Sequence, residues 1–352
     1  MTNTGTLDLQ DLLAVRNVTV AEFGTANIEA ALAAHLEAHN QSLNELSTDL
    51  LMQTVDNVGM WGAGSLGAFF ETDEYGKAPT QKAPPAGEVA WPLSKFQHAI
   101  GWTLDYFRSA TPADLAIAQT AATAGSIAAI KTAVRRAIYG ATNYTVRDRF
   151  LRGQTLTVRR FLNADGTNIP VGPSGEVFVG ATHTHYTAAA TLDVANIQAL
   201  INNVIEHGHG SAVKLVIARG NETVFRALTG FSAYTDPRLI LGTGSNQPAD
   251  RLDITKMDNR AVGLLGSAEV WVRDWAVPGY AFAYSAGDAR KPLALRRKAL
   301  GQGLQGLMLD SRLAEYPLYA DNFELYVGVG ANERTNGAVH QFTNATYQSP
   351  AI

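Results

Sequence analysis

The segment from Asp56 to Trp91 limits what this 352-residue chain can fold into more than any other stretch. It contains six glycines and three prolines, and neither the period of a helix nor that of a strand persists along it. A loop of about 35 residues is uncommon inside a compact domain and is usually a lid, a binding arm or disordered. A solvated linker is a poor fit because the segment contains large apolar side chains, among them Trp61, Leu66, Phe69, Phe70, Val89 and Trp91.

Burial of six side chains cannot by itself order a segment of this length. Fixing each backbone residue costs about 1–2 kcal/mol of conformational entropy, and about 30 residues would have to be fixed. We therefore expect backbone pairing, either within a hairpin or against another chain.

Three glycines of this segment have the spacing G-x-G-x-x-G: Gly62, Gly64 and Gly67. A dinucleotide-binding turn requires a strand before these glycines and a helix after them. Here a leucine-rich helical pattern precedes them, and the following AFFETDEYGKAPTQKAPP cannot form a long helix. We therefore expect no nucleotide and no other cofactor, and we interpret the glycines as relief for a twisted strand or a hinge.

Composition excludes several classes of protein. The net charge of −4 provides no basic excess for general polyanion binding, and the absence of cysteine excludes disulfides and thiol chemistry. Hydrophobic residues make up 46% and charged residues 17%, which favours a surface partly covered by partners. The N-terminus lacks the pattern of a signal peptide, and no run of about 18 apolar residues occurs, so we expect a cytoplasmic product that contacts no membrane.

Two helical patterns flank the loop. Residues 26–55 contain a narrow leucine stripe, which indicates either a helix lying on its own domain or an arm docking on a neighbouring subunit. Residues 111–139 predict a long alanine-rich helix, with Thr111 as cap, Pro112 in the first turn, Asp114 at the positive end and Gly140 after the last turn.

Short strands and one further helix follow Tyr144. The predicted strands are TLTVRRFL, EVFVGATHTHYTA, AVKLVIAR, AEVWVRDWAV and YAFAYS, and the predicted helix is VANIQALINNVIEHG. The last region predicts a helix that passes into an alternating strand. The fold class expected from this order is mixed α/β (α+β).

Four histidines form the only other candidate site. His183 and His185 alternate, so on a strand both would point to one face, and His207 and His209 follow the next helix. Four imidazoles could hold zinc with Glu206 or Asp193 as a base: Glu206 precedes His207, and Asp193 lies in the strand-to-helix turn. No HExxH motif is present, and a histidine at a helix end has an ordinary electrostatic role. We expect no metal and no catalytic residue, with a His-dependent metal enzyme as an alternative.

The order of these parts resembles the major capsid protein of a tailed bacteriophage of the Hong Kong 97 type. The resemblance lies in the helical arm, the glycine-rich loop, the long alanine-rich helix and the α/β unit. Two stretches strengthen it: ATHTHYTAAATLDVANIQALINNVIEHG, and YPLYADNFELYVGVGANERTNGAVHQF with its turn from Arg334 to Ala338.

The resemblance implies a domain organisation. Residues 1–55 would be an N-terminal arm and helix, and residues 56–98 an extended loop lying over a neighbouring subunit. The peripheral domain would comprise residues 99–174 and 306–352, with a spine helix at 111–139, and the axial domain residues 175–305. Candidate contacts between subunits are Trp61, Leu66, Phe69, Phe70, Trp91, Leu36 and Leu43.

The resemblance also implies a function without enzymatic activity. Pentamers and hexamers of the chain would assemble into an icosahedral shell around double-stranded DNA, which the chain would contact non-specifically. Scaffolding, portal and decoration proteins are further expected partners, and the protein would belong to the virion after assembly in the host cytoplasm. An encapsulin-like compartment shell, which holds protein cargo, is the alternative with the same fold.

Overall fold

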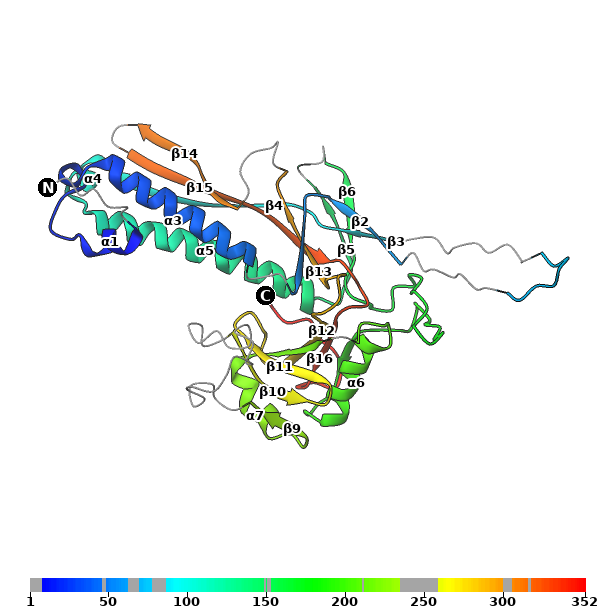
Figure 1. The fold of residues 1–352 in the computed structure, drawn as a ribbon. Coiled ribbons are helices and arrows are strands. Elements are labelled where there is room, and N and C mark those ends of the chain that lie inside the picture. Colours follow the sequence, from blue (N-terminus) through cyan, green and yellow to red (C-terminus); the bar gives the residue numbers. More distant parts are fainter. Residues whose placement is uncertain are drawn as a thin grey trace.

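The computed structural model shows two lobes (Figure 1). Residues 70–77 belong to the glycine-rich loop, which leaves the upper lobe, and they lie well away from both lobes. A five-stranded sheet and the long helix α5 (Pro112–Tyr139) build the upper lobe, and a seven-stranded sheet builds the lower one. The structure describes residues 8–45, 49–62, 70–77, 87–148, 150, 153–210, 212–234, 259–299, 306–315 and 318–352.

Helix α5 begins where the sequence predicts it. The carboxylate of Asp114 accepts hydrogen bonds from the backbone N–H and the hydroxyl of Thr111, at 2.9 and 2.8 Å. Pro112 occupies the first turn, where its missing N–H costs nothing. Small side chains such as Ala116 and Ala122 are buried, which lets neighbouring elements approach closely.

By length and composition α5 is also apolar enough to cross a membrane, contrary to the expectation from sequence that no segment is. One such helix is weak support for a membrane span, because the core helix of a folded domain passes the same test. Helix α5 contacts β15 (Leu318–Ala331) of its own chain, as such a core helix does.

Helix α3 (Thr25–Glu45) lies on α5 of the same chain. Nε2 of His39 is 2.8 Å from the hydroxyl of Ser126 on α5, and the side chain of Asn40 exchanges hydrogen bonds with the backbone of Leu307. Helix α3 is described to Glu45, and residues 51–54, which the stripe predicts as helix, do not continue it. Three shorter helices complete this end of the lobe: α1 (Leu9–Ala14), α2 (Val20–Phe23) and α4 (Leu104–Ser109).

Strand β15 organises the five-stranded sheet. Residues 318–327 pair with one strand and residues 318–325 with a second on the other side. The last five residues pair with a third strand, and β1 pairs in parallel with that third strand. The partners are β1 (Leu51–Thr54), β4 (Ser94–Thr103), β13 (Leu293–Arg297) and β14 (Leu307–Glu315). Residues 51–54 and 313–315 are therefore strands, where the sequence patterns predicted helix.

Two small hairpins extend the upper lobe. Strands β2 (Val58–Trp61) and β3 (Gly87–Ala90) pair antiparallel, as do β5 (Tyr144–Arg147) and β6 (Thr155–Val158). The first of these pairs is the base of the glycine-rich loop.

The seven-stranded sheet has the order β7-β16-β12-β8-β11-β10-β9. Helix α6 (Val194–Ile205) covers β12 and β16 with a stripe of four buried side chains, Ile197, Leu200, Ile201 and Val204. The strands are β7 (Tyr186–Ala188), β8 (Val213–Ile217), β9 (Phe231–Ala233), β10 (Asn259–Leu265), β11 (Ala268–Arg273), β12 (Tyr280–Ser285) and β16 (Ala338–Gln341); η1 (Arg219–Asn221) and α7 (Glu222–Arg226) follow β8.

Two strands pair outside the sheet formed by most strands of their part of the sequence. Strand β13 falls within residues 175–305 but pairs in the five-stranded sheet, and β16 falls within 306–352 but pairs in the seven-stranded sheet. Residues 176–180, predicted as strand, have no regular structure.

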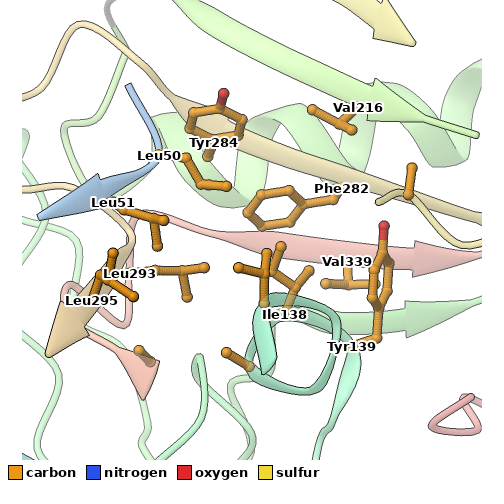
Figure 2. Close-up of a cluster of buried hydrophobic side chains, with 14 of the residues drawn as sticks. Leu50, Leu51, Ile138, Tyr139, Val216, Phe282, Tyr284, Leu293, Leu295 and Val339 are labelled. Atoms are coloured by element: carbon orange, nitrogen blue, oxygen red, sulfur yellow. The ribbon is translucent and has the colours of Figure 1, made fainter. Parts of the chain in front are cut away.

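One apolar cluster joins the two lobes. The C-terminal end of α5 places Ile138 and Tyr139 against Phe282 and Val339 of the seven-stranded sheet, and Leu293 of β13 belongs to the same cluster (Figure 2). All of these side chains are buried. The lobes therefore share a core across the end of α5.

Candidate functional sites: the projecting loop and a histidine cluster

The base of the projecting loop is anchored in its own chain. Nε1 of Trp61 donates a hydrogen bond of 2.6 Å to Glu333, and Nε1 of Trp91 donates one of 2.9 Å to the carbonyl of Ala331. The guanidinium of Arg334 lies over the Trp61 ring, 4.9 Å from its centre. Each tryptophan is only 3% exposed, so little of either side chain remains for a neighbouring subunit.

The far part of the loop is exposed. Residues 70–77 lie away from both lobes (Figure 1) and contain a turn in which the Tyr75 and Gly76 N–H groups donate to Asp73 at 3.0 Å. Phe70 is 49% exposed and Tyr75 is 89% exposed. Tyr75 was not among the predicted contact residues, although it is the more exposed of these two aromatic side chains.

The other predicted contact residues are distributed as follows. Leu36 is half-buried and packs against the core of its own chain. Leu43 lies in α3, and nothing is described of its side chain. Leu66 and Phe69 lie outside the described residues.

The glycines have local structural roles. A Cβ on Gly59 would lie 2.5 Å from the Trp91 ring, and Gly62 has a φ of 76°, which favours glycine. Strand β2, not a helix, precedes the G-x-G-x-x-G sequence, which corrects the prediction from the leucine stripe. Residues 70–77 are not helical, while Gly64 and Gly67 lie outside the described residues.

The structure brings together three of the four histidines. Nε2 of His183 is 3.3 Å from Nε2 of His185 and 3.1 Å from Nε2 of His207, and the last two atoms are 3.1 Å apart. Oε1 of Glu206 is 3.3 Å from Nε2 of His183 and 3.8 Å from Nε2 of His207. We name these four residues the histidine cluster.

Three segments position the histidine cluster. His183 and His185 precede β7, and Glu206 and His207 follow the last residue of α6. The ring of Phe178 packs on His207 and His183, with ring centres 4.2 and 4.9 Å apart. The side chains of His185 and His207 are 0% and 2% exposed.

Burial sets the protonation of these groups. It lowers the pKa of His183, brings that of His207 to about 3 and holds that of His185 well below its usual value, so all three imidazoles are neutral at pH 7. Burial also raises the pKa of Glu206, and the charge of Glu176 adds to this effect.

His209 and Asp193 serve other purposes. His209 lies 2.5 Å from a carboxylate oxygen of Asp288 and 2.8 Å from the hydroxyl of Thr335, and the carboxylate of Asp193 caps α6 by accepting from the Ala195 N–H. Neither belongs to the histidine cluster. The sequence spacing indicated that His183 and His185 would converge, but not which of the two later histidines would join them.

Among solved structures, a phage structure matches nearly the whole of this chain. A structure of Mycobacterium phage Patience matches 99% of this chain and 96% of its own, with a TM-score of 0.68 and 18% sequence identity. Capsid structures of a native GTA particle and of bacteriophage PhiM1 match 85% and 84% of the chain (91% and 85% of their own) at 12% and 10% identity. Both have a TM-score of 0.47.

No protein-family model and no curated protein matches the sequence. The structural match extends over nearly the entire chain and includes both lobes. The chain therefore shares its overall fold with this phage structure, and its fold class is mixed α+β, as the sequence predicted.

Proposed function

We propose that the chain is a major capsid protein, which self-assembles into pentamers and hexamers of an icosahedral shell enclosing double-stranded DNA. The observation that carries this proposal is the near-complete structural match to a phage protein combined with a loop whose base is anchored and whose far part has no core of its own. Apolar and aromatic side chains held away from the subunit are stabilised when a second surface covers them.

The loop has a buried base and an exposed far part, and this difference supports a role in assembly. The buried tryptophans fix the direction in which the β2–β3 hairpin leaves the subunit. Residues 70–77 then present Phe70 and Tyr75, with Glu71, Asp73, Glu74 and Lys77 around them. We infer that this part lies over a neighbouring subunit, and that Phe70 and Tyr75 are its contacts.

The two lobes correspond to the peripheral and axial domains of the proposed shell subunit. We assign α5 and the five-stranded sheet, including β13, to the peripheral domain, and the seven-stranded sheet, including β16, to the axial domain. The axial domains would meet around the five-fold and six-fold axes. Scaffolding, portal and decoration proteins and the packaged DNA are further proposed partners, and host-cytoplasm assembly belongs to the same proposal.

Deleting residues 64–85 tests the assembly role of the loop. The deletion leaves Gly62, Ala63 and Ala86 to connect β2 to β3, so the buried base is retained. We expect the shortened subunit to keep the thermal unfolding midpoint of the full-length subunit but to form no closed particles by electron microscopy.

A matched control substitutes Trp61 with alanine in the full-length chain. This variant should lose subunit stability, because it removes a buried ring and its hydrogen bond to Glu333. If the deletion unfolded the subunit, or if the shortened chain still formed closed shells, the proposed role of the loop would be wrong.

A further inference from the structure

The three Nε2 atoms of the histidine cluster cannot all be satisfied by one another. In a neutral imidazole each nitrogen either carries a proton or presents a lone pair. Three mutually adjacent atoms with two possible states must include at least one like pair, either two N–H groups or two lone pairs facing each other. The three distances of 3.1–3.3 Å therefore hold at least one repulsive contact in any arrangement of protons.

A cation removes this conflict, because all three nitrogens can then present lone pairs to the same point. Zinc bonds to imidazole nitrogen at about 2.0–2.1 Å, which places the ligands of a tetrahedral site about 3.3–3.4 Å apart. An ion placed about 1 Å out of the plane of the three nitrogens would satisfy all three bonds at that length. The triangle of nitrogens has the dimensions of a zinc site.

The fourth corner is occupied by a carboxylate. Oε1 of Glu206 lies 3.3 Å from Nε2 of His183, which is the length of a tetrahedral edge, and 3.8 Å from Nε2 of His207. This oxygen is buried and has no hydrogen-bond partner among the described residues. An acceptor atom turned toward three imidazole nitrogens is a favourable fourth ligand for a cation and an unfavourable neighbour for lone pairs.

Outer contacts hold the ligands in position. Nδ1 of His185 lies 2.8 Å from the carbonyl of Gly337, the geometry of an N–H donor to that carbonyl. That hydrogen bond selects the tautomer in which Nε2 of His185 presents a lone pair to the cluster. The Phe178 ring covers the other two imidazoles.

We propose that His183, His185, Glu206 and His207 bind one Zn²⁺ ion in a structural site. Four protein ligands complete the tetrahedral shell and leave no open position for substrate, so the site is not catalytic. The ion would join the end of α6 to the segment before β7. The hydrogen bond of His185 to Gly337 would extend this link to the start of β16, which lies far from both in the sequence. This role does not depend on assembly of the chain into a shell.

The test uses the full-length chain without a histidine tag, purified from zinc-supplemented cells. We expect about one zinc per chain by elemental mass spectrometry. Removal with a chelator should lower the thermal unfolding midpoint by roughly 5 °C, and added Zn²⁺ should restore it. Substituted Co²⁺ should give the intense visible absorption of a tetrahedral site.

Two variants separate binding from folding. His183→Gln, at the most exposed of the three histidines, should fold but lose the zinc and the response to chelator. His98→Ala, at an exposed position of β4, should keep both. The proposal is overturned if the purified chain carries no zinc and its unfolding midpoint ignores added Zn²⁺, or if His183→Gln binds zinc as the unmodified chain does. An octahedral Co²⁺ spectrum would likewise overturn the closed four-ligand site.

Discussion

Trp61 and Phe70 belong to the same apolar segment but differ in what covers them. Trp61 is 3% exposed within its own subunit, whereas Phe70 is 49% exposed. Trp61→Ala should therefore lower the free energy of subunit unfolding by about 3–5 kcal/mol. Phe70→Ala should change it by less than about 0.5 kcal/mol and impair particle formation instead. Urea unfolding of subunits and particle counts by electron microscopy measure the two effects, and a large loss of stability in Phe70→Ala would contradict the assignment.

Asp165 gives the subunit a defined acid sensitivity. Burial raises the pKa of its carboxyl, but hydrogen bonds from Thr167 and the charge of Arg334 outweigh burial and hold the pKa well below the usual range. A depressed carboxyl pKa stabilises the folded state above the unfolded pKa of about 4, and this stabilisation is lost as the pH falls toward the folded pKa. Arg334 is fully buried and lies 2.9 Å from Asp165. Removing the carboxylate would leave the buried guanidinium without its countercharge, which lowers the free energy of unfolding.

Asp165→Asn should thus reduce subunit stability by about 3 kcal/mol at pH 7. The difference from the unmodified chain should shrink by about 1 kcal/mol at pH 3, because the unfolded carboxyl is then mostly protonated. Urea midpoints at the two pH values measure this change. An equal difference at both would show that the charge of Asp165 does not contribute.

At the scale of elements, the long helix α5 contains one glycine that packing does not require. Gly125 is exposed, and apart from its chain neighbours and the surrounding helix backbone no atom of the described residues lies within 4 Å of the position its Cβ would occupy. Gly125→Ala should raise the free energy of unfolding by about 0.5–1 kcal/mol, because alanine loses less backbone entropy in a helix. The matched substitution Gly59→Ala in β2 should destabilise, since its Cβ would meet the Trp91 ring. Chemical denaturation of the two variants should give opposite signs, and a loss of stability in Gly125→Ala would refute the helix assignment there.

Sequence predicted elements well where the signal was local. Thr111, Pro112 and Asp114 fix the start of α5 through contacts within four residues, and the stripe from Ile197 to Val204 fixes α6. Strand β1 was missed because Leu51 pairs with Leu293, some 240 residues away, and nothing near Leu51 encodes that partner. The histidine cluster was predicted only in part for the same reason. The two-residue spacing of His183 and His185 is local, but the position of His207 beside them depends on how α6 packs.

At the scale of the whole molecule, the shared core explains how one chain can hold two lobes in a fixed relation. Ile138 and Tyr139 at the end of α5 share one buried cluster with residues of both sheets, so this cluster holds the two sheets together (Figure 2). A subunit with fixed angles between its contact surfaces favours closed, symmetric assemblies over open aggregates.

The measurement that tests self-assembly most directly is electron microscopy of the full-length chain after expression and purification, across a range of protein concentrations and together with a crowding agent. We predict closed shells tens of nanometres across, or rings of five and six subunits, as expected for closed point-group symmetry. Only monomers and dimers under every condition would contradict the proposed capsid function. Shells containing a single co-purified enzyme would instead identify a protein compartment with the same fold.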